Sequence, residues 1–276
     1  INSNDIRNKK LLIEIFNKSV NNNVKYQYLL SYLYSDYYLC VKNDYNKQLY
    51  WLEEAFKKNK NNYYKYELYH KAIIDLAGLY YNKQNYDKTK DLIENLILNS
   101  HKSYYSSLEK KRSEMMSMIY YYDKNYKECM KWLTRGSIIN SSLCIHNLGL
   151  FHYYGTIVSQ NFIQAKNFLK TSYEMDYIPS CYYLGEIYFN GYGVQPHISK
   201  ALMYYNKGYK NDCNLCSLKL GMIYFDGIRV YRNYNKVKKY LDKIKFREDE
   251  IAIKALNILE KIYFNIDNKK YFKFIK

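Results

Sequence analysis

Proline, glycine and long apolar runs are scarce in this chain of 276 residues, and each shortage excludes a class of structure. With only 2 Pro and 10 Gly, the chain lacks the turns that an all-β sandwich needs about every 8–12 residues. No run approaches the roughly 18 consecutive apolar residues that a membrane-spanning helix requires. A hydrophobic content of 48% argues against a disordered chain. We therefore expect an almost wholly helical protein with an apolar core.

Cysteine is also sparse, since six residues in a chain of this length are too few for a disulfide framework. We expect reduced, partly buried thiols and a reducing compartment inside the cell, either the cytoplasm or a mitochondrion or other organelle. Cys213 and Cys216 form a lone C-x-x-C, but a zinc site needs more ligands and a redox site usually needs a thioredoxin-like βαβ unit. The chain starts at Ile1 without Met or a signal-like stretch, so we expect a fragment or processed product.

What the chain does contain is a repeat of 36 residues in its C-terminal half. A Leu-Gly pair recurs at this interval, with its glycine at Gly149, Gly185 and Gly221. A second glycine follows each pair, at Gly155, Gly191 and Gly227. A small or short residue comes sixteen positions after the first glycine, at Ala165, Ala201 and Val237. Gapless columns across three units indicate a true structural repeat.

The glycines predict how each repeat folds. Glycine inside a helix costs about 1 kcal/mol relative to alanine, so Gly185 indicates that a second helix passes too close for a Cβ. We expect Ala201 to be the small residue that faces Gly185 from that second helix. Gly191 and Gly193 are expected to end the first helix, because glycine readily adopts the left-handed conformation found there. Each unit is therefore predicted to be an antiparallel helix pair closed by a glycine turn.

The same pattern continues upstream in a looser form. The close-contact column stays small throughout, at Ser31, Ala77, Ser117, Gly149, Gly185 and Gly221. We count six helix pairs, with capping helices around residues 5–18 and 249–264. The predicted organisation has four parts: an N-terminal cap (1–26), degenerate repeats (27–140), three 36-residue repeats (141–246), and a C-terminal cap with a basic tail (247–276).

These motifs resemble two related families of helical repeats. The units at 144–245 resemble Sel1-like repeats, with Leu-Gly-x-x-Tyr, a Gly-x-Gly-Val turn at Gly191 and a Lys-Ala-x-x-Tyr-Tyr second helix. The units at 75–98 and 115–136 have the shorter turn of tetratricopeptide repeats. The resemblance covers roughly 28–245 and implies an α-solenoid that acts as a scaffold or adaptor in multiprotein complexes. Some bacterial relatives staple each pair with a disulfide, but here Cys144, Cys181 and Cys216 have no partner thiols at the corresponding positions.

No pattern in the sequence indicates an enzyme. His152 occupies the tyrosine column of the repeat and is most simply a packing residue. No phosphate-binding glycine loop, nucleophile elbow or His-Glu-x-x-His helix is present. We therefore expect no catalytic residues, no metal, no cofactor and no small-molecule substrate.

A row of aromatic residues is the first candidate partner-binding surface. In tetratricopeptide-like solenoids the first helix of each pair lines the concave face, where ligands usually sit. On these helices the candidate residues are Tyr81, Tyr121, Tyr153, Tyr154, Tyr182, Phe189 and Phe225. Aromatic side chains anchor interfaces, but these residues could equally pack against the next repeat or reflect an excess of tyrosine, of which there are 38.

Basic charge is the second candidate surface, since 43 Lys and Arg outnumber 26 Asp and Glu. Candidate contacts for RNA or an acidic partner are Arg229, Arg232, Lys236, Lys238, Lys239, Lys243, Lys245, Arg247, Lys269, Lys270 and Lys273. A solvated lysine-rich face, or codon bias of an AT-rich genome, would give the same pattern. Two functions stay open: a non-enzymatic protein-interaction scaffold within a larger complex, and a helical-repeat subunit of a ribonucleoprotein, for example an organellar ribosome, that contacts RNA through this surface.

Overall fold

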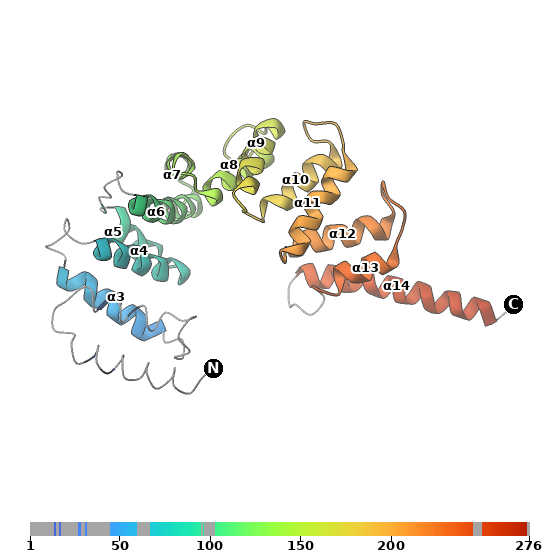
Figure 1. The fold of residues 1–276 in the computed structure, drawn as a ribbon, viewed down its shortest axis with the longest axis horizontal. Helices are drawn as coiled ribbons and strands as arrows, with labels where there is room; N and C mark the ends of the chain where they lie inside the picture. The colour runs from blue at the N-terminus through green and yellow to red at the C-terminus, as the bar shows by residue number, and fades with distance from the viewer. Residues whose placement is uncertain are drawn as a thin grey trace. The chain divides into compact units, whose positions relative to one another are not determined.

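The computed structural model describes residues 14, 17, 27–28, 31, 45–59, 67–94, 96, 103–244 and 250–274. All regular structure in these ranges is α-helical, and the helices are labelled α3 to α14 (Figure 1). This confirms the all-α prediction. The predicted helix at 5–18 and most of the first helix of the first pair lie outside the described residues. The chain divides into two compact units, residues 1–139 and 140–276, and each is considered by itself.

The described residues of unit 1 form two complete helix pairs and part of a third. Its helices are α3 (Tyr45–Asn59), α4 (Glu67–Asn82), α5 (Tyr86–Glu94), α6 (Ser103–Tyr122) and α7 (Tyr126–Ile138). α4 packs against α5, and α6 packs against α7, while α4 also contacts α3 and α6. Ile73, Met116 and Ile119 form the centre of one apolar cluster, and Leu52 and Leu76 belong to a second one beside it. Because each cluster is shared between successive pairs, no pair buries its apolar face alone.

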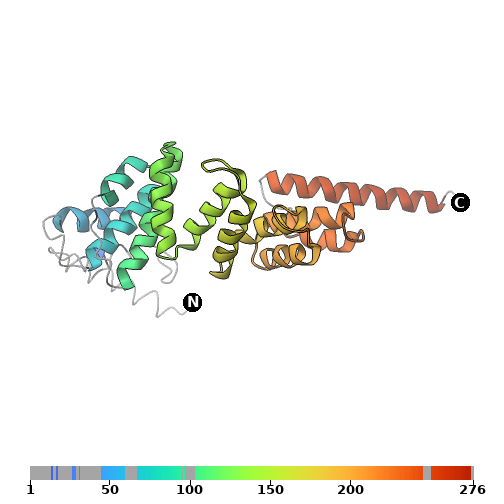
Figure 2. The same cartoon turned by 90° about the horizontal axis from the view of Figure 1, so that it is seen from above.

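Unit 2 contains three complete pairs and a long final helix. Its helices are α8 (Ser142–Tyr154), α9 (Phe162–Glu174), α10 (Ser180–Asn190), α11 (Ile198–Lys210), α12 (Asn214–Asp226), α13 (Tyr234–Leu241) and α14 (Glu250–Phe274). α14 packs against both α12 and α13, and Figure 2 shows it continuing past them. The predicted last helix therefore exists, but it ends ten residues later than expected and includes most of the predicted basic tail.

The turns within the pairs of unit 2 are made as the glycine pattern predicts. Gly155, Gly191 and Gly227 each follow a helix in the left-handed conformation, with φ between 69° and 79°. In unit 1 the turns are shorter, and the left-handed positions are taken by Gln84 and Lys124. The shorter turn explains why this half resembles tetratricopeptide repeats in its sequence.

Two further sets of residues recur every 36 positions and shape unit 2. Asn140, Asp176 and Asp212 adopt positive φ at the joints between pairs, a conformation that Asn and Asp tolerate better than most side chains. The second helix of each pair is capped by a side chain that accepts a backbone N–H three residues later, from Asn161, His197 and Asn233. Both recurrences can be read directly from the sequence.

The partner of the helical glycine differs from the prediction. A Cβ built on Gly185 would lie 2.3 Å from the ring of Tyr205, and all three nearest heavy atoms belong to that ring, not to Ala201. The same holds one repeat earlier and later, where Gly149 faces Leu169 and Gly221 faces Leu241. The facing residue therefore comes four positions after the small residue that the sequence suggested. Ala201 is fully buried, but its small size is not what admits Gly185.

Alanine at two helical glycines should have opposite effects on stability. Gly185→Ala should destabilise unit 2 by about 1–3 kcal/mol, because the buried Tyr205 ring has no room to move away. Gly78→Ala should stabilise unit 1 by about 0.5–1 kcal/mol, because no described atom beyond the adjoining helical turns lies within 4 Å of the new Cβ. Denaturant unfolding of both variants checks the signs, and a loss of stability at Gly78 would contradict the described geometry.

Candidate functional site

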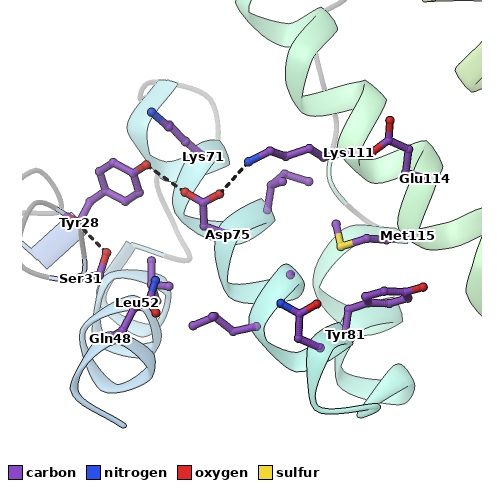
Figure 3. A pocket seen from close by; sticks show the side chains of 14 residues that line it. Tyr28, Ser31, Gln48, Leu52, Lys71, Asp75, Tyr81, Lys111, Glu114 and Met115 are labelled. Atoms are coloured by element: carbon purple, nitrogen blue, oxygen red, sulfur yellow. Dashed lines mark hydrogen bonds and ion pairs between the residues drawn. The ribbon is translucent and has the colours of Figure 1, made fainter. Parts of the chain in front are cut away.

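A groove of about 470 Å³ opens between helices of unit 1 (Figure 3). It is lined by Tyr28 and Ser31 and by residues of α3, α4 and α6. Its apolar lining comes from Leu52, Ile74, Leu79 and Met115. Because these residues are up to 63 positions apart in the sequence, the groove exists only once successive helix pairs have stacked.

Asp75 links the walls of this groove. The Tyr28 hydroxyl donates to Oδ2 of Asp75 at 3.0 Å, and the Lys111 ammonium donates to Oδ1 at 3.3 Å. The ammonium of Lys71 lies 5.5 Å from the centre of the Tyr28 ring. Three helical segments are thus tied together through one carboxylate. The Lys111 side chain is 55% exposed, so its ion pair contributes little, on the order of 0–1 kcal/mol.

Gly78 leaves part of the groove unfilled. It lines the groove on α4, and the space where its side chain would project is open. The side chains of Gln48 and Asn82 also line the groove, and each amide offers both donors and an acceptor. An apolar floor with amides around it suits an extended peptide, whose backbone groups need partners while its side chains seek apolar space.

Two of the predicted aromatic residues belong to unit 1. Tyr81 lines the groove, and its ring lies 5.6 Å from that of Tyr86, which in turn stacks on Tyr122 at 5.7 Å. Tyr121 is 36% exposed and contacts Tyr122 and Tyr126. Burial raises the pKa of Tyr81, so its hydroxyl stays neutral and can donate a hydrogen bond. Tyr81, at the edge of the groove, therefore also belongs to a cluster of tyrosines from α4, α5, α6 and α7.

Three predicted aromatic residues of unit 2 surround Tyr183 on α10. The rings of Tyr153, Tyr154 and Tyr182 lie 5.4, 6.1 and 5.2 Å from the Tyr183 ring. Tyr154 is 55% exposed, whereas the others are half-buried. Burial raises the pKa of Tyr182 to about 12 and also raises that of Tyr153. The rings pack mainly against one another across neighbouring repeats, so only the Tyr154 end is open to a partner.

The remaining two aromatic residues do not form a common surface with these tyrosines. Phe189 is only 8% exposed and belongs to the apolar core of unit 2. The guanidinium of Arg229 lies 5.3 Å from its ring centre and donates to its backbone carbonyl. Phe225 is half-buried and packs at the edge of the same core near Tyr234. Both residues lie on the first helix of a pair, as the sequence predicts. Phe189, however, is buried in the core and packs there instead of facing a partner.

Two of the predicted basic residues lie together beside the loop between α12 and α13. Arg229 and Lys236 line a shallow pocket of about 830 Å³ together with Tyr224 and Tyr231. The Lys236 ammonium lies 4.4 Å from the Tyr224 ring centre and donates to its hydroxyl at 3.2 Å. Tyr231 is 96% exposed. Two cations beside an exposed ring form a surface that an anion could occupy.

The other basic residues lie apart from this pocket or outside the described residues. Arg232 donates to the carbonyl of Asp226 at 3.1 Å, and Lys243 pairs with Asp212. Lys238 is half-buried and Lys239 is exposed on α13. Lys245 and Arg247 are not among the described residues. Lys269, Lys270 and Lys273 lie on the last turns of α14, where the structure describes the backbone alone.

Two histidines, His146 and His152, pack against aromatic side chains. His152 stacks on Phe168, with ring centres 5.6 Å apart. His146 is buried against Tyr177 and Tyr183, and its Nδ1 lies 2.8 Å from the hydroxyl of Ser180. Burial lowers the pKa of His146 to about 4, so the ring is neutral at physiological pH. Among the described residues, no three His, Cys, Asp or Glu side chains are gathered as metal ligands would be.

The family model of the Sel1 repeat matches five segments of the chain, residues 24–60, 116–137, 142–177, 178–213 and 215–243. These segments cover more than half of the sequence. The chain belongs to the Sel1 repeat family. The suspected resemblance is thereby confirmed, and the Sel1 repeat fold is typical of protein–protein interaction scaffolds and generally non-catalytic.

One solved Sel1 repeat structure supports the same fold, and a second is reported beside it. A Sel1 repeat protein from Oxalobacter formigenes is 20% identical and superposes with a TM-score of 0.61, covering 80% of this chain and 86% of that one. A protective antigen of uropathogenic Escherichia coli with an SLR fold is 16% identical with a TM-score of 0.46, covering 92% and 67%. No curated protein sequence matches the chain significantly. In this Sel1 repeat chain, none of the described helices is long and apolar enough to cross a membrane.

Sequence reasoning missed the groove of this Sel1 repeat chain, apart from Tyr81. The residues that Asp75 links come from different helix pairs. Tyr28 lies 47 residues before Asp75 and Lys111 lies 36 residues after it, so no single repeat interval relates all three. One signal was available: Gly78 is a glycine inside a helix, next to the small column but not part of it. A helical glycine with no packing role suggests open space above it.

Proposed function

We propose that this Sel1 repeat chain is a non-enzymatic scaffold that binds an extended segment of a partner protein in the groove of unit 1, within a larger complex. The observation that carries the proposal is the open space above Gly78, bounded by helices of successive pairs. A groove formed by stacked repeats places many weak contacts along one line, which suits a peptide better than a compact ligand.

The chemistry of the groove indicates what the segment should contain. Leu52, Ile74 and Met115 offer apolar contact, so an apolar side chain of the partner should lie above Gly78. The charged lining is balanced, with Lys71 and Lys111 opposite Asp75 and Glu114. The partner segment therefore needs no strong net charge, and its binding should depend only weakly on salt.

Filling the groove at Gly78 should abolish partner binding without disturbing the fold. We expect Gly78→Phe to reduce capture of partner proteins from native lysate at least about tenfold, because a ring would occupy the space that the peptide needs. Gly78→Ala is the matched control: it changes the same position but leaves the space open, and it should capture the wild-type set. Bound species are identified by mass spectrometry, and circular dichroism checks that both variants remain helical.

The proposal fails if Gly78→Phe, still folded, captures the same proteins as the wild type. Capture that is lost equally in Gly78→Ala and Gly78→Phe would also contradict it, since the alanine leaves the groove open. Each lysate is divided and one half is treated with nuclease. A partner set that survives nuclease and moderate salt supports the scaffold function.

A second candidate function is an RNA-contacting subunit of a ribonucleoprotein. The pocket of Arg229 and Lys236 beside the exposed Tyr231 favours it, because cations and an aromatic ring together can hold phosphate and stack a base. The nuclease-treated half distinguishes the two functions. Co-purifying RNA, with proteins that disappear on nuclease treatment, would replace the scaffold function by this one.

A further inference from the structure

Two cysteines lie together at the start of α12. Cys213 is the residue that caps this helix, and Cys216 lies in its first turn. Cys129, Cys181, Cys213 and Cys216 are free thiols. Side chains three apart on a helix are neighbours, with about 5–6 Å between Cβ atoms, so a small local adjustment brings two such sulfurs within bonding distance.

Exposure divides the pair into an accessible and a buried thiol. Cys213 is half-buried at the helix end, whereas Cys216 is fully buried. Gly208 on α11 makes room for the buried thiol, since a Cβ there would lie 2.3 Å from Sγ of Cys216. Cys181 on α10 approaches the same point, with its Cβ 3.4 Å from that position. An outer thiol with an inner one behind it is the arrangement that thiol–disulfide exchange uses.

The surroundings of Cys213 favour its thiolate. The neighbouring Cys216 thiol and the backbone N–H groups at the start of α12 lower the pKa of Cys213 to about 6, against the opposing effect of burial. The other titratable groups near the pair are Lys207, Glu186, Tyr182 and Cys181.

The pKa values of two cysteines outside the pair shift in the opposite direction. Burial raises the pKa of both Cys129 and Cys181 to about 11. The sequence alone favoured structural thiols for Cys213 and Cys216, because no thioredoxin-like unit surrounds them. The helix end supplies the same local electrostatics without that unit, since its free N–H groups and dipole stabilise an anion.

We propose that Cys213 and Cys216 form a thiol–disulfide exchange site that reacts with a low-molecular-weight disulfide such as glutathione disulfide. The Cys213 thiolate attacks one sulfur of the disulfide, forms a mixed disulfide and releases the other half as a thiolate. The Cys216 thiol then loses its proton to water, and its sulfur attacks Sγ of Cys213. The second half leaves as a thiolate, so two protein thiols are oxidised to one disulfide while the small disulfide is reduced to two thiols.

The first step prepares the second. The neighbouring Cys213 thiolate and burial both raise the pKa of Cys216. Once Cys213 is in a mixed disulfide, its negative charge is gone. Cys216 then deprotonates more easily, at the moment when it is needed as the attacking group.

Tryptic peptides make the proposal directly measurable. Residues 211–219 form one tryptic peptide that holds Cys213 and Cys216 and no other cysteine, and Cys181 lies in the separate peptide 171–200. The full chain is equilibrated with mixtures of reduced and oxidised glutathione, the free thiols are alkylated, and the peptides are weighed. We expect peptide 211–219 to lose two hydrogens as the mixture becomes oxidising. Iodoacetamide should modify Cys213 at pH 7 at least about tenfold faster than Cys129, the buried control in the same chain.

Two variants assign the roles of the cysteines. Cys216→Ser should trap glutathione on Cys213, because the resolving thiol is absent. Cys213→Ser should leave Cys216 unmodified, because the buried thiol cannot attack first. The proposal is overturned if peptide 211–219 stays a dithiol in every mixture, or if it is found cross-linked to peptide 171–200. It is equally overturned if Cys216 takes up glutathione as fast in Cys213→Ser as Cys213 does in Cys216→Ser, with circular dichroism confirming that each variant is folded.

Discussion

Replacing Tyr205 with alanine is expected to lower the free energy of unfolding of unit 2 by about 3–5 kcal/mol. Tyr205 is the largest fully buried side chain among the described residues, and its ring fills the space left by Gly185 on the facing helix. Its hydroxyl donates to Glu186 at 2.5 Å, and Glu186 also pairs with Lys219. Removal of the ring therefore opens a cavity and takes one donor from a carboxylate that is mostly buried.

Hydrogen exchange measures this loss where it occurs. Exchange of peptides from α10 and α11 is followed at increasing denaturant, and peptides from α4 and α6, which belong to the other compact unit, serve as the internal reference. Tyr205→Phe keeps the ring and loses only the hydroxyl, so it should cost about 1 kcal/mol. Tyr205→Leu should cost less than Tyr205→Ala, since Leu169 and Leu241 face the glycines of the other two repeats. A cost for Tyr205→Ala no larger than for Tyr205→Phe would show that the ring does not fill that space.

Replacing Arg112 with alanine should destabilise unit 1 by about 3–5 kcal/mol. Arg112 is only 6% exposed, and its guanidinium lies 5.0 Å from the centre of the Trp132 ring. It donates to the backbone carbonyl of Glu94 at 3.0 Å and lies 3.5 Å from Glu109, which also pairs with Arg135. Without Arg112, the carbonyl at the end of α5 loses its partner and Glu109 keeps only one of its two cations.

The neighbouring lysine provides the control for this prediction. Lys110 lies on the same helix but is more exposed, and Lys110→Ala should change stability by less than about 0.5 kcal/mol. Arg112→Met, which retains much of the packing volume, should cost less than Arg112→Ala. Denaturant unfolding followed by Trp132 fluorescence reports on this region. If Lys110→Ala and Arg112→Ala lowered the free energy of unfolding by the same amount, the buried contacts of the Arg112 guanidinium would contribute nothing to stability.

The repeat pattern was sufficient to predict the helices but not which side chains face each other. The small column from Ala77 to Gly221 is buried at every described position, as its spacing indicated. Periodicity alone could not choose between Ala201 and Tyr205 as the residue opposite Gly185. The two lie one helical turn apart on the same face, so the choice depends on how far one helix slides along the other.

The candidate sites were harder to predict than the fold for a related reason. An aromatic column gives the helix face, but exposure depends on what the next repeat places over it. Arg229 covers Phe189, whereas Tyr154 has no such cover and is 55% exposed. The groove depends on side chains from segments that are far apart in sequence, and Asp75 has a recognisable role only when Tyr28 and Lys111 are both beside it.

The left-handed joints at Asn140, Asp176 and Asp212 also bear on how such a gene can change its length. Each joint has the same backbone conformation and lies 36 residues from the next, so the chain enters every repeat of unit 2 in the same way. Unequal recombination between the DNA segments that encode two of these joints would delete or duplicate a whole helix pair. The backbone geometry at the resulting junction would be unchanged. A point substitution must fit among core side chains that are already in place. A duplicated helix pair, in contrast, carries side chains that already pack against one another.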